Sequence, residues 1–451
     1  MKNNRMDMLN GSMMDKIFLF ALPLAASSIL QQLFNSADVA VVGRYAGKEA
    51  LAAVGATGPV VGLLINLFVG LSIGANVVTA KYLGQQNEEG VKKSVHTSIL
   101  LALVSGLILL VVGQVLVKPL LVLMAMPEEV LPLATLYMRI YFIGMPFIML
   151  YNFGSAILRS IGDTKRPLFC LFVSGIINLL LNLFFVIVCG MSVEGVAIAT
   201  VTSNVVSSGL VVLFLVKENS AIHLDLKALA INKRILTEVA GIGIPAGVQG
   251  MVFSFSNVCI QGALNSFGPV AMAGSAAAIN FEYYTYYVLN AFSQTCTTFV
   301  SQNMGADNIK RCGQIVLRIV ITSALAVAAV SLVFVAFDRP LLSIFTKDEA
   351  VMQYGLIRMH TILLFQVINS MIEVFSGALR GMGHSAVPAC MALAGVCGFR
   401  LLYVFTYFQN HRTIENLFRV YPMSWAITGL AVSLCFIILY IKKYKEKYAV
   451  S

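Results

Sequence analysis

One carboxylate stands inside the first long apolar stretch of the chain, and its chemistry is the most informative in the sequence. Asp38 follows Ser27, Gln31 and Asn35 at intervals of four, four and three residues, so the four side chains share one helical face. An apolar environment disfavours the charged form of a carboxylate, so Asp38 could take up a proton or another cation. The alternative is a surface ion pair with Arg44 near the outer end of the same helix.

Two later apolar stretches carry amides and hydroxyls at helical spacing. Asn178 and Asn182 are one turn apart in the fifth stretch, and Thr200 and Asn204 are one turn apart in the sixth. Each row alone is typical of polar contacts between membrane helices. Together with Asp38, the two rows could line one polar cavity in the first half of the chain.

The second half holds three charged residues of interest within apolar stretches, namely Glu282, Glu373 and Arg400. An acid beside Arg400 could form a structural ion pair, or the group could contact a substrate. The residues that we expect to line a substrate cavity are Gln31, Asn35, Asn152, Asn204, Glu282, Glu373 and Arg400.

Long apolar segments must position these side chains. Hydrophobic residues form 58% of the 451 positions and charged residues 12%, a balance that soluble domains do not show. Continuous runs near or above the roughly 20 residues that span a bilayer predict an all-α integral membrane protein with twelve transmembrane helices. The spans are expected at about 15–42, 51–80, 94–117, 130–156, 166–189, 194–216, 236–264, 270–302, 312–336, 351–379, 386–408 and 421–441.

An internal repeat relates the two halves. The sequence LRSIG at 158–162 reappears as LRGMG at 379–383, about 221 residues later, and Pro23 and Asn35 reappear as Pro245 and Asn257. Six spans per half give a parallel repeat of two pseudo-symmetric lobes, which is typical of transporters whose bundles rock about a central site. We expect an N-terminal six-helix lobe at 1–216, a cytoplasmic linker at 217–235 and a C-terminal six-helix lobe at 236–451.

The net charge of +10 has a simple membrane explanation. Basic pairs such as Lys92–Lys93 and Lys165–Arg166, and the tail Lys442–Lys447, all fall in segments that share one side. The positive-inside rule places that side and both termini in the cytoplasm, in a multi-pass protein of the cytoplasmic (inner) membrane. Nucleic-acid binding therefore has no support.

Motifs for catalysis or for a nucleotide are missing. The glycine-rich loops lack the G-K-S/T ending of a phosphate-binding loop, and no metalloprotease motif or nucleophile elbow occurs. We expect neither an enzyme nor a cofactor or bound metal, and transport powered by an ion or solute gradient. The eight cysteines form no C-x-x-C pair and are expected to pack as small apolar residues.

Several motifs together resemble those of the multidrug and toxic compound extrusion (MATE) family, in its DinF-like bacterial branch. They are Pro23 followed by NSAD at 35–38, ALAAVG at 50–55, QNMGA at 302–306 and the paired LRxxG loops. The resemblance covers essentially the whole chain. It implies a V-shaped pair of six-helix lobes that exports organic, often cationic, compounds in exchange for inward H⁺ or Na⁺.

The resemblance also implies roles for single residues. Asp38 matches the family's first-helix acid, which takes up the coupling cation, and Asn178 matches a polar position in the fifth helix. Asn182 stands where that branch commonly has Asp, so a carboxylate-rich Na⁺ site is less favoured than proton coupling. We expect Asp38, Asn178, Asn182 and Thr200 to form the cation-coupling site of a monomer that handles small organic molecules in the bilayer.

Two other functions stay open. A flippase for a lipid-linked saccharide precursor would need a basic cavity for a pyrophosphate, and only Arg139, Arg358 and Arg400 lie within spans. A receptor or scaffold that does not transport would leave the duplicated half unexplained. Movement of a solute across vesicles distinguishes these functions from an antiporter.

Overall fold

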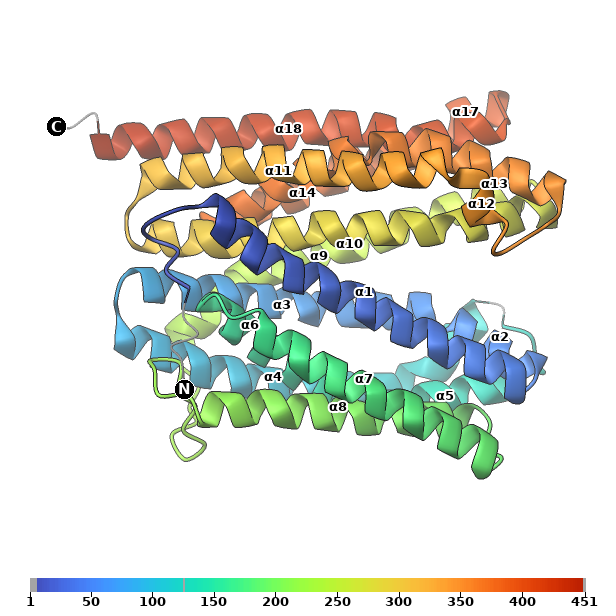
Figure 1. The fold of residues 1–451 in the computed structure, drawn as a ribbon, viewed down its shortest axis with the longest axis horizontal. Helices are drawn as coiled ribbons and strands as arrows, with labels where there is room; N and C mark the ends of the chain where they lie inside the picture. Colours follow the sequence, from blue (N-terminus) through green and yellow to red (C-terminus); the bar gives the residue numbers. More distant parts are fainter. Residues whose placement is uncertain (1–5, 125, 449–451) are drawn as a thin grey trace. The chain divides into compact units, whose positions relative to one another are not determined.

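The computed structural model describes residues 6–124 and 126–448, and every regular element in that part of the chain is a helix (Figure 1). The predicted all-α class is therefore confirmed. The chain divides into two compact units, of which unit 1 contains Leu22–Gly247 and unit 2 contains Met8–Ala21 and Val248–Ser451. Each unit has its own core of buried aliphatic and aromatic side chains.

The compact units differ in their boundaries from the lobes expected from the repeat, because two helices are shared. Helix α1 (Met14–Tyr45) belongs to unit 2 up to Ala21 and to unit 1 from Leu22. Helix α9 (Lys233–Asn265) belongs to unit 1 up to Gly247 and to unit 2 beyond it. Each change of unit falls within three residues of a proline inside the helix, Pro23 in α1 and Pro245 in α9.

Unit 1 is built around α6, which packs against α3, α4 and α8. Gly106 of α4 makes this packing close, since a Cβ there would lie 2.3 Å from the Cα atom of Pro146. The remaining elements of this unit are α2 (Lys48–Ala56), α3 (Gly58–Gly84), α4 (Glu88–Leu123), α5 (Leu131–Ile143), α6 (Met145–Ser160), α7 (Lys165–Leu183), the π-helical turn η1 (Phe184–Val188) and α8 (Val193–Val216).

Unit 2 is built around the contact of α10 with α14, and α11 and α18 lie beside that pair (Figure 1). A π-helical segment, η3, interrupts the eleventh predicted span. The elements are α10 (Pro269–Gly305), α11 (Ile309–Ala336), α12 (Asp338–Leu342), α13 (Glu349–Ile362), the 3₁₀ turn η2 (Leu363–Phe365), α14 (Gln366–Gly381), α15 (Ala386–Ala392), η3 (Leu393–Gly398), α16 (Phe399–Phe405), α17 (Tyr407–Asn410) and α18 (Ile414–Tyr448).

Most of the predicted spans are long apolar helices. Among the described residues, ten helices are long and apolar enough to cross a membrane, and α5 with α6 makes an eleventh span bent by 48°. The remaining predicted span, 270–302, is the eighth along the chain and forms the 37-residue helix α10, which is too polar to qualify by composition. Many of its polar side chains are buried within unit 2 and bond back to the helix, as Thr285 and Thr295 do. Polar side chains are tolerated between membrane helices when they are hydrogen-bonded within the protein, as these hydroxyls are.

The outward faces of the long helices are apolar. Leu107, Val111 and Val115 recur every fourth residue on α4 and are 55%, 59% and 65% exposed. In a soluble protein such a stripe would be an aggregation hazard, whereas lipid chains cover it in a bilayer. The chain is therefore a multi-pass membrane protein.

The linker expected at 217–235 has no helix before α9 begins at Lys233. It is not a loose tether, because Ile222 and Leu224 are fully buried. The backbone N–H of Asp225 donates to His96 Nε2 at 3.2 Å, which fastens the segment to α4. The cytoplasmic location of this segment stays a prediction.

Candidate functional site

The four residues predicted to handle a coupling cation lie together in unit 1. Asp38 of α1 is 8% exposed, and the amide nitrogen of Asn182, on α7, donates to its Oδ1 atom. The Thr200 hydroxyl, on α8, lies 3.5 Å from Asp38 Oδ2. Asn178 completes the set, since its Nδ2 donates to Thr200 Oγ1 at 3.4 Å. These residues, Asp38, Asn178, Asn182 and Thr200, are called the Asp38 cluster.

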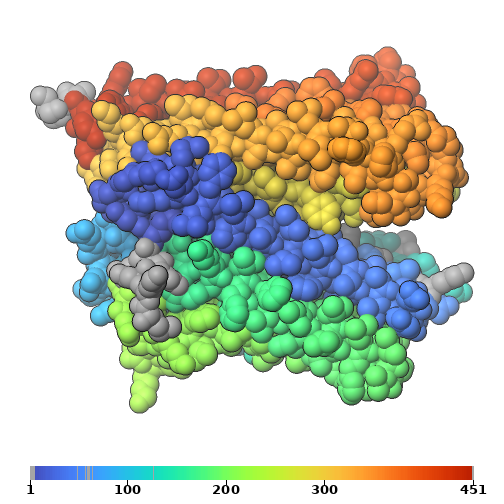
Figure 2. Space-filling view, viewed as in Figure 1, coloured from blue at the N-terminus to red at the C-terminus, as the bar shows by residue number. Residues whose placement is uncertain are grey.

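A glycine on α7 allows α1 to come close enough for these contacts. A Cβ at Gly175 would lie 1.8 Å from the ring of Phe34, so any larger residue would push that ring and α1 away. Gly175, Asn178 and Asn182 follow each other at intervals of three and four, so one face of α7 meets α1. Helices α1 and α7 lie side by side on the face shown in Figure 2. Sequence reasoning did not find the role of Gly175.

The hydrogen bonds of the Asp38 cluster leave acceptors unsatisfied. Asn182 Nδ2 donates to Asn178 Oδ1 at 3.3 Å as well as to Asp38, but the buried Asn182 Oδ1 has no partner among the described residues. The single Thr200 hydroxyl proton has two possible acceptors, Asp38 Oδ2 and the Val196 carbonyl at 2.9 Å. An excess of oxygen acceptors around a buried carboxylate suits a proton or a small cation.

The surface alternative for Asp38 does not describe this site. Among the described residues, no ion pair within 4.0 Å joins Asp38 to Arg44 or to any other base. The Arg44 guanidinium instead lies 5.9 Å from the ring centroid of Tyr45. The carboxylate is thus held by neutral hydrogen-bond donors.

Two tyrosines of α5 also belong to the surroundings of Asp38, and sequence reasoning missed them. Tyr137 and Tyr141 lie near Asp38 and stack on each other with ring centroids 6.1 Å apart. Both phenol groups are buried or half-buried. Their separation of four residues on a predicted span was the available signal.

The polar residues predicted for a substrate cavity in unit 1 are placed less uniformly. Gln31 and Asn35 are exposed on α1, on the turns before Asp38. Asn152 and Asn204 are half-buried, and the Asn152 amide donates to its own helix at the Ile148 carbonyl, 2.8 Å away. None of these four makes a hydrogen bond to the Asp38 cluster in the part of the chain described.

The predicted charged residues of unit 2 form a different arrangement. Glu282 binds Arg358 through two hydrogen bonds, Nε to Oε1 at 2.5 Å and Nη2 to Oε2 at 2.9 Å. Arg400 is buried, and no acid lies within 4.0 Å of it in the described ranges, so an ion pair there is not found. Glu373 is buried on α14, where its backbone carbonyl accepts from Ser293 at 2.7 Å. Glu282 is therefore a structural partner of Arg358.

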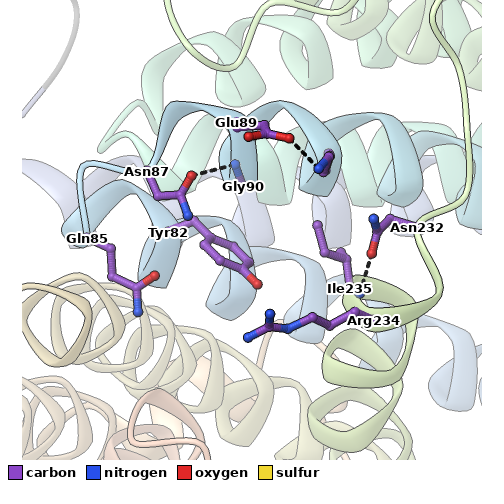
Figure 3. Close-up of a pocket in the computed structure, with 9 residues that line it drawn as sticks. Tyr82, Gln85, Asn87, Glu89, Gly90, Asn232, Arg234 and Ile235 are labelled. Carbon is purple, nitrogen blue, oxygen red and sulfur yellow. Dashed lines mark hydrogen bonds and ion pairs between the residues drawn. The ribbon is translucent and has the colours of Figure 1, made fainter.

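A pocket of about 240 Å³ lies at the ends of α3, α4 and α9 in unit 1 (Figure 3). Its polar groups already serve local structure. Asn87 Oδ1 caps α4 by accepting from the Gly90 N–H at 2.8 Å, and Asn232 Oδ1 accepts from the Ile235 N–H at 3.2 Å at the start of α9. Glu89 pairs with Lys93 one turn along α4. Most of the polar groups in this pocket thus stabilise helix ends, and the pocket lies apart from the residues predicted for the site.

Residues typical of a transition-metal site do not gather anywhere in the described chain. No group of three or more His, Cys, Asp or Glu is placed to hold a metal there. Within those ranges the eight cysteines are free thiols, several of them buried, such as Cys170 and Cys296.

Comparison with known proteins gives the context for this geometry. The family model described as MatE matches the chain twice, at 23–184 and at 245–406. These two matches confirm the internal repeat.

Three curated relatives match at length. The probable multidrug resistance protein YoeA of Bacillus subtilis is 26% identical over 92% of this chain and 91% of its own length. The probable multidrug resistance protein NorM of Thermotoga maritima is 26% identical over 87% and 86%. A protein of Shewanella oneidensis named FAD transporter is 27% identical over 71% and 72%.

Solved structures share the fold. A MATE structure in the straight conformation superposes with a TM-score of 0.90, at 21% identity over 99% of both chains. A structure titled as the outward-facing conformation of a multidrug resistance MATE family transporter superposes with a TM-score of 0.89, at 22% identity over 99% of both.

Proposed function

The chain belongs to the MatE family, and we propose that it is a cation-coupled antiporter that exports organic, often cationic, drug-like compounds. Transport would cross the cytoplasmic membrane by alternating access, in a monomer with both termini in the cytoplasm. Support comes from relatives named multidrug resistance proteins that match most of the chain. The single observation that carries coupling is the buried Asp38, which neutral donors from α7 and α8 surround.

The donor set of the Asp38 cluster favours a proton as the coupling ion. Protonation turns one Asp38 oxygen from an acceptor into a donor. A flip of the Asn182 amide would then present Oδ1, the unpartnered acceptor, to that donor. A sodium ion could use the same oxygens, but the cluster offers it one carboxylate only, and hard cations prefer several charged oxygen ligands.

Coupling requires that cation and substrate favour different conformations. A ligand that binds both conformations equally shifts neither. We propose that substrate enters from the cytoplasm or the inner leaflet, and that cation uptake at Asp38 from outside favours the conformation that releases it. Asp38 would be neutralised in one half of the cycle and charged in the other.

Efflux of ethidium from energised cells or vesicles tests this function, with the proton and sodium gradients collapsed separately. We expect efflux to need Asp38 and the proton gradient, so that Asp38→Asn abolishes it. Asp15→Asn, an exposed acid on the same helix, is the matched control. Undiminished efflux by the Asp38→Asn variant would contradict the proposal that Asp38 couples efflux to the cation gradient. If well-inserted protein moves no dye, FAD and lipid-linked saccharides are the next cargoes to test, because one relative is named FAD transporter.

A further inference from the structure

A second polar cluster lies in unit 2 around Arg400 of α16. The side chain is 2% exposed, and its Nε donates to Ser424 Oγ at 2.9 Å. Its Nη1 lies 3.1 Å from Asn257 Oδ1 and 3.4 Å from Ser256 Oγ. All three acceptors are neutral. Arg400 with Ser256, Asn257, Ser424 and Tyr421 is called the Arg400 cluster.

A second buried arginine of unit 2, Arg358, faces the same Tyr421 ring and is paired with Glu282. Both carboxylate oxygens of Glu282 accept from Arg358, whose Nη1 donates to Ser275 Oγ at 2.6 Å. That pair is complete in itself. Arg400 consequently has no counter-ion within 4.0 Å, and its Nη2 makes no hydrogen bond to any residue in the described ranges.

The ring of Tyr421 offsets only part of this charge. The Arg400 guanidinium carbon lies 4.4 Å from the ring centroid, and that of Arg358 lies 5.7 Å from the same centroid. One aromatic face attracts both cations, while the two cations repel each other. One acid and two arginines leave a buried positive charge, which is costly unless a negative group joins it.

The repeat relates this cluster to the cation-coupling site of the first half. The separation that relates Pro23 to Pro245 and Asn35 to Asn257 also relates Asn178 to Arg400. In the first half this position belongs to a cluster built on a carboxylate. In the second half the same place holds a guanidinium and no acid, so the polarity of the site is inverted.

We propose that the Arg400 cluster binds an anionic group, supplied either by the carboxylate of a zwitterionic substrate or by a free chloride ion. The unpartnered Nη2 provides a charged donor, and the Ser256 hydroxyl can rotate to donate as well. The Ser424 hydroxyl donates to the Tyr421 carbonyl at 2.8 Å and holds the acceptor of Arg400 Nε in place. The substrate source rests on the proposed export function, whereas the chloride source does not.

The chain carries its own reporter for this site. Trp425 is the only tryptophan in the sequence, is buried, and follows Ser424 directly on α18. Its ring lies 5.9 Å from that of Tyr421, centroid to centroid. Sodium chloride is titrated into the purified full chain in detergent, against sodium isethionate at constant ionic strength, while the fluorescence of Trp425 is followed.

Two dyes that differ only in a carboxylate test the substrate source. Rhodamine 110 carries a free carboxylate, which is a methyl ester in rhodamine 123. Binding of each is measured for wild type, Arg400→Gln and the matched control Arg419→Gln, an exposed arginine of α18. Loss of a charge-assisted contact should weaken binding by about tenfold or more.

Each outcome decides the proposal. A saturable chloride response that Arg400→Gln abolishes establishes the chloride source. Weaker binding of rhodamine 110 by that variant, with rhodamine 123 unchanged, establishes the substrate source. If wild type shows no saturable chloride response and binds the two dyes with equal affinity, the anion site is overturned.

Two further measurements cover the cases in which Arg400→Gln does not fold or neither dye binds. If Arg400→Gln does not fold, Arg400→Lys replaces it, and any real site should show a several-fold loss because the planar fork is gone. If neither dye binds at all, the proposed drug export fails, yet the chloride titration still decides the anion site. The two failures are therefore distinguishable.

Discussion

Asp38 is the one carboxylate of the Asp38 cluster, and from this we predict an exchange of one proton for one substrate molecule. When the substrate is a dye with a single positive charge, this exchange moves no net charge across the membrane. Transport should then respond to a pH gradient and be indifferent to the membrane potential.

The dye gradients expected for exchange of one proton, of two protons or with net charge movement differ widely. One proton moving down a gradient of one pH unit supplies about 1.4 kcal/mol, which sustains about a tenfold dye gradient. Two protons would sustain about a hundredfold gradient. If one net charge moved per cycle, a potential of about 100 mV would add about 2.3 kcal/mol, which is roughly fiftyfold.

Proteoliposomes with a fixed pH gradient give the measurement, and the steady-state ethidium ratio is the readout. Nigericin removes the pH gradient, and valinomycin with potassium sets the potential independently. Wild type and Asp15→Asn should both reach about a tenfold ratio per pH unit. Asp38→Asn has no group to protonate at this site and should reach equal concentrations on both sides.

Three results would refute this reasoning. A ratio near a hundredfold per pH unit would require a second acid, of which the buried Glu373 is the first to examine. Dye accumulation driven by the membrane potential without a pH gradient would show that each transport cycle moves net charge across the membrane. A tenfold ratio kept by Asp38→Asn would remove this carboxylate from coupling altogether.

Three structural predictions concern close helix packing in unit 1 and the buried ion pair of unit 2. Gly175→Ala should lower thermal stability and efflux together, because the added Cβ would lie 1.8 Å from an α1 ring, and overpacking of this kind costs about 1–3 kcal/mol. Gly247→Ala should destabilise the protein by a similar amount, since its Cβ would lie 2.5 Å from an α3 carbonyl oxygen. Gly241→Ala, on the same helix, is the control: its Cβ would meet nothing within 4 Å, so this change should be neutral or stabilising. Arg358→Leu should cost about 3–5 kcal/mol in the melting of solubilised protein, and Glu282→Leu in the same chain should recover much of it, because the single change leaves a buried acid unpaired. Equal melting temperatures for Gly247→Ala and Gly241→Ala, or no recovery in the Leu pair, would contradict these contacts.

The sequence predicted the helices well, because a membrane demands long apolar runs with the backbone satisfied internally. Spacing placed Asn178 and Asn182 on one helical face, and the family resemblance led us to expect Asp38, Asn178, Asn182 and Thr200 in one site, where the structure brings them together. Other features depend on which helix lies alongside, and spacing carries no such information. The fit of Gly175 against an α1 ring is one example, and the polar α10, which other helices cover, is another.

The repeat relates backbone positions, and it does not conserve their charges. Asp38 stands where the second half has the apolar Ile260, and Asn178 stands where it has Arg400. If the second half also had an acid at the position of Asp38, the chain would have two equivalent cation sites and would couple transport to two protons. In this chain the second copy has a guanidinium without a counter-ion within 4.0 Å among the described residues, and Glu282 is bound to Arg358, which shares the Tyr421 ring with Arg400. Because the second site carries a positive charge in place of an acid, we expect cation coupling in unit 1 alone. A steady-state dye ratio of about tenfold per pH unit in vesicles would reflect this difference between the two halves.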